Sequence, residues 1–423
     1  MIFWLINHDS SFITVSFLLK KSQRNPLLNN KKTIIFVAMP DSIHTARWLE
    51  QLSEQGWDIH LFPSTLITGL HPRICQVTAH YLFHKKRILD TDSPKHSVIK
   101  LFERVFYAVL RRGFAQLSLS WRTRQLAKLI ACVQPDILHS LEIQHAGYLT
   151  LAAKTQLKNQ FPTWIVTNWG SDIYLFGKMP QHQDKIKQVL AQCDYYACEC
   201  ERDVTLARDY GFNKTVLPVF PNTGGFDLSS LANIRGQLLT AERKIIMLKG
   251  YQHFAGRALI GLQSLAACAD VLQGYTVVIY SASKQVIKEA KLLTEQTAID
   301  VKIVPHSTSH DDILAFHAQA RISIGLSISD AISTSLLEAM VMGSFPIQSC
   351  TACADEWIEH GVSGAIVPAE EPEIIAMWIR KALLDDELVN HAAAINWQTA
   401  LARLDSEALK QQAIAIYNAV ESR

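Results

Sequence analysis

The sequence lacks an excess of charge of either sign. Its 41 lysine and arginine residues face 39 aspartate and glutamate residues, which leaves a formal net charge of +2. A protein that binds nucleic acid through its overall charge carries a clear basic excess, so no nucleic-acid partner is expected. A hydrophobic share of 48% is typical of a soluble globular protein. Since 423 residues exceed what one hydrophobic core usually supports, we expect two domains.

The eight cysteines form no regular framework, which favours reduced thiols in the cytoplasm over structural disulfides. Two pairs have short spacings, Cys350-x-x-Cys353 and Cys198-x-Cys200. No second pair with the spacing of metal ligands accompanies either of them. We therefore expect no metal ion.

The chain also lacks an uninterrupted apolar run at its start. Apolar stretches at 1–6 and 12–19 are separated by polar residues and are too short to span a membrane. Basic residues such as Lys20 and Arg24 follow them, whereas a signal peptide carries its basic residues first. We expect residues 1–30 to be a disordered extension, with a membrane-touching arm as the alternative. A periplasmic binding protein is disfavoured, because no convincing export signal precedes the first predicted strand.

Short apolar runs alternate with helical patterns along most of the chain, as in parallel α/β sheets. In the first half, strands are predicted at 33–39, 58–63, 73–83, 136–140, 163–168 and 195–198. In the second half they are predicted at 244–248, 275–281, 301–305, 321–327, 346–349 and 365–368. A cluster of proline, asparagine and glycine within 220–233 marks the best linker between the two series.

These two series predict two Rossmann-like, doubly wound domains that face each other across a cleft. We place an N-terminal domain at 31–225 and a C-terminal domain at 240–395, followed by C-terminal helices at 396–423.

The segment 329–346 carries the most chemical information. Asp330 follows a predicted buried strand, and Glu338 lies one turn into a helix predicted at 335–342. Ser333 or Thr334 can cap the N-terminus of that helix. Unpaired backbone N–H groups and the positive end of the helix dipole bind anions, while the two carboxylates suit a ligand rich in hydroxyls. This combination favours a sugar nucleotide.

Several motifs resemble those of the GT-B fold glycosyltransferases, and within them glycosyltransferase family 4. The resemblance covers roughly residues 31–395 and rests on motif order and spacing. The motifs are Asp330-x7-Glu338-Ala-Met-x-x-Gly343-x-x-Pro346, Gly361-Val-Ser-Gly-Ala-Ile-Val-Pro368, Asp41-Ser-Ile-His-Thr-Ala-Arg-Trp48, Gln134-Pro-Asp-Ile-Leu-His139 and Pro221-Asn222.

This resemblance implies transfer of a sugar from a nucleotide sugar to a glycan or lipid-linked acceptor, with retention and without a metal or other cofactor. It also implies that the domain at 240–395 binds the nucleotide sugar, that the domain at 31–225 is on the acceptor side, and that the helices at 396–423 cross back to the first domain. Lys249 and Arg257 would contact the diphosphate, and Asp330 the donor sugar. Glu338 would bind the ribose diol, with Ser333, Thr334 and Ser335 beside it at the helix N-terminus. An ordinary solvated or capping role is the alternative for each of these residues.

Three departures from the family pattern bear on activity and donor identity. Asp330-Ala-Ile-Ser333 stands where the family usually has Glu-Gly-Phe-Gly, so the acid is one methylene shorter. Trp169 precedes Gly170-Ser-Asp172 where the family often has histidine. The segment from Lys249 to Arg257 also departs from the usual Gly-Arg…Lys-Gly order.

On the acceptor side, polar and aromatic residues follow or flank predicted strand ends. Trp169 can stack on the apolar face of a sugar, and Asp172 can accept its hydroxyl groups. His44, His139 and His145 are candidate contacts, although a single histidine is more often a hydrogen-bonded structural residue. A dedicated base is not required if the donor phosphate takes the acceptor proton, as is thought for the family.

The segment 95–128 contains eight lysine and arginine residues against one acid, beside apolar residues at helical spacing. It predicts either a basic helix that binds an anionic membrane surface or one that packs on its own domain. We expect a cytoplasmic protein, either free or peripheral on the inner membrane face. The family resemblance further implies a role in cell-surface polysaccharide assembly such as lipopolysaccharide. The alternatives are a nucleotide-sugar epimerase or hydrolase on the same fold, and a non-catalytic nucleotide-sugar-binding subunit.

Overall fold

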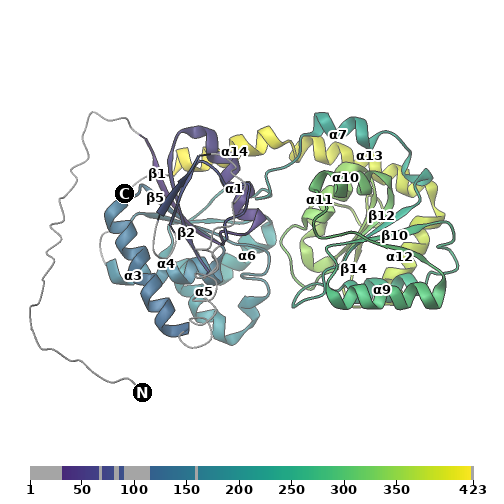
Figure 1. The fold of residues 1–423 in the computed structure, drawn as a ribbon, viewed down its shortest axis with the longest axis horizontal. Coiled ribbons are helices and arrows are strands. Elements are labelled where there is room, and N and C mark those ends of the chain that lie inside the picture. The colour runs from purple at the N-terminus through teal and green to yellow at the C-terminus, as the bar shows by residue number, and fades with distance from the viewer. Residues whose placement is uncertain (1–30, 66–68, 81–84, 90–114, 158–160, 421–423) are drawn as a thin grey trace, which may run out of the picture. The chain divides into compact units, whose positions relative to one another are not determined.

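The computed structural model describes residues 31–65, 69–80, 85–89, 115–157 and 161–420, which are coloured in Figure 1. The extension at 1–30 and most of the basic segment at 95–128 lie outside the described residues. From Lys32 onward the chain packs as one unit.

The first sheet has the strand order β4-β3-β2-β1-β5-β6-β7-β8. Neighbouring strands run parallel except β3 and β4, which are antiparallel. The strands are β1 Thr33–Ala38, β2 Asp58–Pro63, β3 Val77–His80, β4 Lys85–Ile88, β5 Ile137–Leu141, β6 Thr163–Thr167, β7 Tyr195–Ala197 and β8 Thr215–Val216.

Strand β1 shows why this sheet forms. All six of its residues are buried, and successive side chains of a strand point to opposite faces of the sheet. Ile34 and Phe36 join one hydrophobic core, whereas Ile35 and Val37 join the core on the other face. A parallel sheet covered on both faces requires such an uninterrupted apolar run.

The second sheet is wholly parallel, in the order β11-β10-β9-β12-β13-β14. The chain moves outward from β9 to β11 and then returns to the other side of β9, which is the doubly wound arrangement. The strands are β9 Ile245–Lys249, β10 Thr276–Tyr280, β11 Asp300–Ile303, β12 Ala320–Gly325, β13 Phe345–Ser349 and β14 Ala365–Val367.

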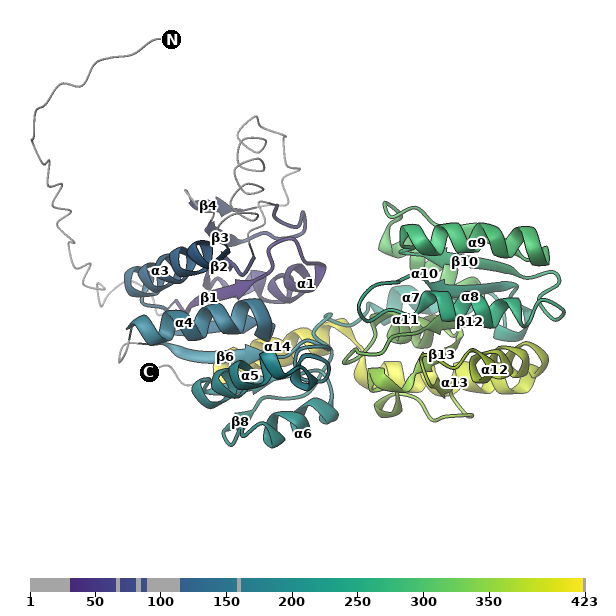
Figure 2. The same ribbon diagram turned by 90° about the horizontal axis from the view of Figure 1, so that it is seen from below.

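Helices cover both faces of each sheet, as Figure 1 and Figure 2 show. The α-helices are α1 Ile43–Leu52, α3 Ala115–Val133, α4 Tyr148–Leu157, α5 Pro180–Gln192, α6 Glu201–Asp209, α7 Leu228–Arg235, α8 Ala258–Ala266, α9 Lys284–Thr297, α10 His310–Gln319, α11 Thr334–Met342, α12 Pro372–Leu384, α13 Asp386–Arg403 and α14 Ser406–Ala419. A π-helical turn, η2, spans Ile143–Gly147, and short 3₁₀ turns span Ser53–Gln55, Phe176–Lys178, Thr240–Glu242, Cys350–Ala352 and Ala354–Glu356. No helix in the described part of the chain combines the length and apolar character needed to cross a membrane.

The C-terminal helix α14 packs against the first sheet, beside α1. Its Tyr417 is fully buried and accepts a hydrogen bond from the indole N–H of Trp48, at 2.7 Å. Leu409 and Ala413 join the same core. Helix α14 is thus part of the hydrophobic core of the first sheet.

Two local expectations differ from the structure. The strand expected at 73–83 is shorter, Val77–His80, and pairs with the antiparallel strand β4, whose charged sequence gives no strand pattern. The linker expected at 220–233 includes the start of α7, because Asp227 caps that helix through the backbone N–H of Ser230.

Candidate active site

The central position in the second sheet is the point where strand order reverses, between β9 and β12. Ligands of doubly wound sheets bind at this point, beyond the carboxyl ends of the strands. Lys249 is the last residue of β9, and Asp330 lies in the loop between β12 and α11. The fold therefore brings the basic residue and the acidic motif to one edge.

The N-terminus of α11 at this edge has no side-chain cap. Ser333 occupies the expected N-cap position, but its hydroxyl contacts the hydroxyl of Ser335 at 2.8 Å and not the helix backbone. The Lys249 ammonium lies 3.5 Å from the Ser333 hydroxyl oxygen. A cation beside an uncapped helix N-terminus is suited to bind a diphosphate.

The two predicted phosphate-binding cations, Lys249 and Arg257, have different partners. Lys249 lies over the ring of Tyr251, 4.9 Å from its centroid. Arg257 instead forms an ion pair with the exposed Glu370, at 2.6 Å, and donates to carbonyls of its own loop. Of the two residues, only Lys249 has a contact with the N-terminus of α11 among the described interactions.

Glu338 lies in the second turn of α11 and is only 6% exposed. Its Oε1 accepts a hydrogen bond from His310 Nε2 at 2.8 Å. Burial raises the pKa of Glu338, but the His310 hydrogen bond and the electrostatic effects of His317, His310 and, least, Arg47 outweigh it, so that the pKa is lowered overall. Glu338 is thus a carboxylate held ready to accept hydrogen bonds.

The Asp330 loop is fixed through its backbone. The Asp330 carbonyl accepts a hydrogen bond from the Arg202 guanidinium at 2.8 Å, and the hydroxyl of Ser329 bonds that of Ser171 at 3.0 Å. A side chain at Gly170 would place its Cβ 2.6 Å from the Ala331 nitrogen, so this approach requires glycine. The turn after β6, which includes Trp169, therefore packs directly on the acidic loop.

Two of the predicted acceptor-side residues lie near this loop. The rings of His44 and Trp169 are 5.6 Å apart. Desolvation by the surrounding protein, with the charge of Arg47, lowers the pKa of His44 to about 4, although its side chain remains exposed to solvent. His44 is thus a neutral imidazole at neutral pH, able to donate or accept a hydrogen bond.

Asp172 and His145 have local structural partners. Asp172 is 6% exposed and accepts hydrogen bonds from the backbone N–H groups of Trp169 and Ile143, both at 2.9 Å. Burial and the nearby Glu142 raise the pKa of Asp172 well above its ordinary value. His145 bonds the Glu142 carboxylate through its ring and its backbone N–H. These bonds shape the turn that presents Trp169.

His139 is completely buried on β5, and both of its ring nitrogens are engaged. The Tyr417 hydroxyl accepts from Trp48, so it donates to His139 Nδ1, at 2.7 Å. Nε2 then carries the proton and donates to the Thr167 hydroxyl at 2.6 Å. The structure places His139 in the core that anchors α14, away from any exposed surface.

This burial predicts a pH-dependent stability. Burial lowers the pKa of His139 to about 3, whereas an unfolded chain binds the proton near pH 6.5. Below pH 6.5 only the unfolded state gains a proton, so the folded state loses stability as the pH falls. Between pH 6.5 and 5, wild type should lose roughly 2 kcal/mol more than H139Q. Urea unfolding at both pH values measures this difference, and parallel losses in the two proteins would contradict it.

Cysteines from the two short-spaced motifs meet. Cys200, Cys353 and Glu356 place their ligand atoms within 4.8 Å of one another, and the two sulfur atoms are 3.0 Å apart. The Glu356 carboxylate already accepts the backbone N–H groups of Glu201 and Arg202 at the start of α6. This carboxylate thus acts as the cap that α6 lacks from its own Cys200.

Sequence reasoning missed two acidic residues at strand ends of the first sheet. Glu142 follows β5 with a φ of 85° and caps η2 through the N–H groups of His145 and Ala146. Glu199 follows β7 and accepts the Asn222 N–H at 2.7 Å, and burial raises its pKa to about 8. Their position after a parallel strand was the signal that could have singled them out.

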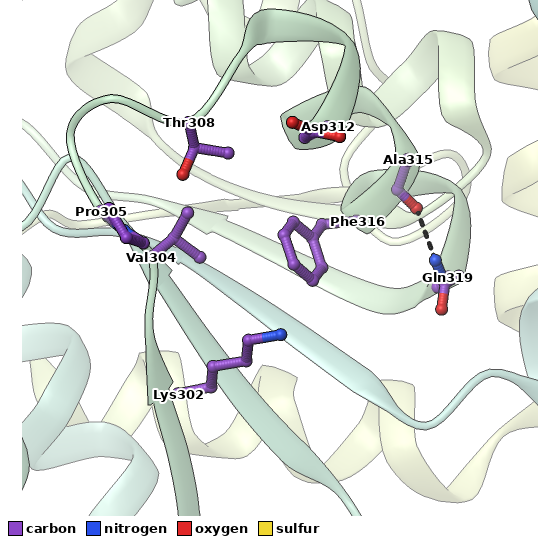
Figure 3. A pocket seen from close by; sticks show the side chains of 8 residues that line it. All are labelled: Lys302, Val304, Pro305, Thr308, Asp312, Ala315, Phe316 and Gln319. Atoms are coloured by element: carbon purple, nitrogen blue, oxygen red, sulfur yellow. Dashed lines mark hydrogen bonds between the residues drawn. The ribbon is translucent and has the colours of Figure 1, made fainter.

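A cavity of about 420 Å³ lies beside β11 and α10 (Figure 3). Its lining residues are Lys302, Val304, Pro305, Thr308, Asp312, Ala315, Phe316 and Gln319. Successive residues of an α-helix are turned by about 100° about its axis. The lining residues that belong to α10 therefore lie on the face of that helix opposite to His310; they are Asp312, Ala315, Phe316 and Gln319. This cavity is therefore separate from the Glu338 site, and no predicted site residue lines it.

Two family models match this chain. Residues 90–199 match the model described as glycosyl transferase 4-like, and residues 263–396 match the model described as glycosyl transferases group 1. Together the matches span more than half of the 423 residues. The chain is a GT-B glycosyltransferase of the family 4 type. No curated protein sequence matches it.

Solved structures share the fold of this GT-B glycosyltransferase. Sucrose-phosphate synthase from Thermosynechococcus elongatus has a TM-score of 0.65 at 16% identity, covering 92% of this chain and 98% of that one. Anabaena HepE in complex with UDP-glucose has a TM-score of 0.62 at 14% identity, covering 92% and 100%. The trehalose-6-phosphate synthase OtsA has a TM-score of 0.62 at 11% identity, covering 93% and 100%. The expected α/β fold class is confirmed.

Proposed function

We propose that this GT-B glycosyltransferase moves a sugar from a nucleotide sugar to a glycan or lipid-linked acceptor, with retention and without a metal ion. The observation that carries the proposal is the edge of the second sheet. There Lys249 approaches the uncapped N-terminus of α11, and the same helix carries the buried carboxylate of Glu338 in its second turn. The complex of HepE with UDP-glucose supports a nucleotide-sugar donor, and uridine diphosphate is the first nucleotide to test.

In this proposal the diphosphate binds between Lys249 and the first turn of α11, at Ser333, Thr334 and Ser335. Glu338 accepts hydrogen bonds from the ribose diol, and Asp330 contacts the donor sugar. As the bond between the sugar C1 and the phosphate oxygen breaks, negative charge grows on the departing diphosphate. The Lys249 ammonium and the helix dipole stabilise this charge, which removes the need for a metal ion.

The acceptor binds on the side of the first sheet, where Trp169 stacks on it and His44 bonds one of its hydroxyls. The acceptor oxygen forms the new bond to C1 on the face that the phosphate leaves. Its proton passes to a phosphate oxygen of the departing diphosphate. His139 has no place in this step because it is completely buried.

We also propose that the enzyme serves cell-surface polysaccharide assembly and touches an anionic membrane surface through residues 95–128. Within the described part of that segment, Arg124 and Lys128 of α3 are exposed. Arg122 donates to the Pro63 carbonyl at 2.7 Å. Failure to co-sediment with anionic liposomes at low salt would rule out the membrane contact.

A donor panel tests the function. The purified protein is incubated with nucleotide sugars, with and without a glycan and lipid-linked acceptor panel, and in the presence of EDTA. We expect release of nucleoside diphosphate that depends on acceptor and resists EDTA. Turnover without acceptor would favour an epimerase or hydrolase, and binding without any turnover would favour a non-catalytic subunit.

The Asp330 position offers a further test of this proposal. The Asp330 carboxylate accepts its own loop's Ala331 N–H at 3.0 Å, which fixes its reach. Lengthening it in D330E shifts the carboxylate by about one methylene and should lower kcat/KM about tenfold to a hundredfold. D330N, which keeps the length, separates the effects of reach and charge. An unchanged kcat/KM and donor preference in D330E would exclude Asp330 from donor binding.

A further inference from the structure

Helix α10 presents two histidines to Glu338. His310 is its first residue and His317 its eighth, so the two lie two turns apart on one face. His310 Nε2 lies 2.8 Å from Glu338 Oε1, and His317 Nε2 lies 3.7 Å from Oε2. Each carboxylate oxygen therefore faces its own imidazole.

The direction of the shorter bond follows from the chemistry of the carboxylate. An ionised carboxylate only accepts hydrogen bonds, so the proton of this bond sits on His310 Nε2. Bonds of this kind to a charged acceptor are stronger than neutral ones. The His310 side chain is 36% exposed, whereas that of Glu338 is 7% exposed. His310 thus lies between solvent and the carboxylate.

The His317 ring is held in place on the side away from Glu338. Its Nδ1 contacts the Ser323 hydroxyl at 2.8 Å, and that oxygen lies 2.5 Å from the Ser344 hydroxyl. The ring also meets Tyr280 edge-on, with 5.6 Å between centroids. His317 is completely buried, and its Nε2 has no hydrogen-bond partner among the described residues. This nitrogen is aimed at Glu338 Oε2, just beyond hydrogen-bond distance.

We propose that His310 and His317 are positioning residues that fix the Glu338 carboxylate for binding the ribose diol of the donor. The inference rests on the proposed function, since it assumes that Glu338 binds the nucleotide. His310 donates to Oε1 and restrains the rotation of the carboxylate. The buried His317 faces Oε2, so the carboxylate cannot turn further inwards. The oxygen lone pairs that the two imidazoles do not occupy then stay in place for the ribose diol.

Other charged or polar groups act on the same carboxylate. Arg47 of α1 contributes a positive charge, and Tyr280 at the end of β10 lies close enough to interact with Glu338. Neither of them has a hydrogen bond to Glu338 among the described interactions. The orientation of the carboxylate therefore depends on α10.

The test uses whichever of UDP, GDP, ADP and CDP binds the wild type most tightly, together with its 2′,3′-dideoxy counterpart. H310L removes the N–H group that donates a hydrogen bond to Glu338, whereas H310Q can place an amide N–H where His310 Nε2 lies. We expect H310L to bind the ribonucleotide about tenfold to a hundredfold more weakly and the dideoxynucleotide unchanged. H310Q should retain most of the affinity. In turnover, H310L should raise the donor KM and leave kcat nearly unchanged.

A matched control is H391L, which replaces an exposed histidine on α13 and should change neither affinity. H317Q, checked for folding by its melting curve, should behave like H310L: it should weaken binding of the ribonucleotide and leave binding of the dideoxynucleotide unchanged. Equal losses for both nucleotides, or no loss in H310L while E338Q loses the preference for ribose, would overturn the positioning role and leave the proposed function intact. Absence of binding by any of the four diphosphates to wild type would overturn both.

Discussion

Replacing Lys249 with alanine is expected to lower kcat by about a hundredfold to a thousandfold, the effect of removing one preorganised charge from a transition state. Lys249 ends β9 at the reversal point of the second sheet, and its ammonium lies 3.5 Å from the Ser333 hydroxyl at the start of α11. The negative charge on the departing diphosphate grows during the reaction. Loss of the Lys249 ammonium therefore affects kcat more than KM. Initial rates over a range of donor concentrations separate the two.

Lys244 provides the matched control for this variant. It immediately precedes β9, at the opposite end of the strand, where it is exposed and lies over the ring of Tyr275. K244A should therefore leave kcat within about twofold, because exposed side chains far from a site have small effects. A K249A enzyme with wild-type kcat would show that the leaving group is stabilised elsewhere.

Replacing Arg321 with alanine is expected to destabilise the protein by about 3–5 kcal/mol, as the removal of a buried, hydrogen-bonded charge does. Arg321 lies on β12 and is 1% exposed. Its guanidinium donates to the carbonyls of Ala382 and Ala241 and to the carboxylate of Asp386, at 2.6–2.8 Å. The variant leaves the two carbonyls without this donor and creates a cavity under the second sheet.

A variant of Asp386 separates the contribution of the ion pair from that of the buried carbonyls to the stability lost in R321A. The Asp386 side chain is 73% exposed, so its ion pair with Arg321 is screened by water. D386N should therefore cost about 1 kcal/mol or less. Urea unfolding of both variants measures the difference, and similar losses would show that the ion pair, not the buried carbonyls, accounts for the stability.

The strands were predictable where burial on both faces leaves an uninterrupted apolar run. The predicted strand at 58–63 matches β2 in both of its ends, and the run at 321–327 overlaps β12. Strand β4 escaped prediction because its Lys-Lys-Arg-Ile sequence has no apolar alternation, and it forms by pairing with β3. The π-helical turn η2 depends on a positive φ at Glu142, which a periodicity cannot reveal.

The candidate site was predictable where its residues are close in sequence. Asp330, Ser333 and Glu338 share one loop and helix, so their spacing placed them together. The contact between Glu338 and His310 joins residues 28 positions apart, and that between His139 and Tyr417 joins residues 278 apart. Such contacts depend on how helices pack on a sheet, and an isolated histidine in a sequence does not indicate which of these roles it has.

Binding of nucleoside diphosphates by the purified protein tests the central claim most directly, because a ligand that binds only the folded state raises its melting temperature. A thermal-shift screen against nucleoside diphosphates and their sugars is compared between wild type and E338Q. The account predicts that at least one nucleotide raises the melting temperature of wild type and has a much smaller effect on E338Q. No shift with any nucleotide, or equal shifts in the two proteins, would contradict a nucleotide-sugar site at the N-terminus of α11.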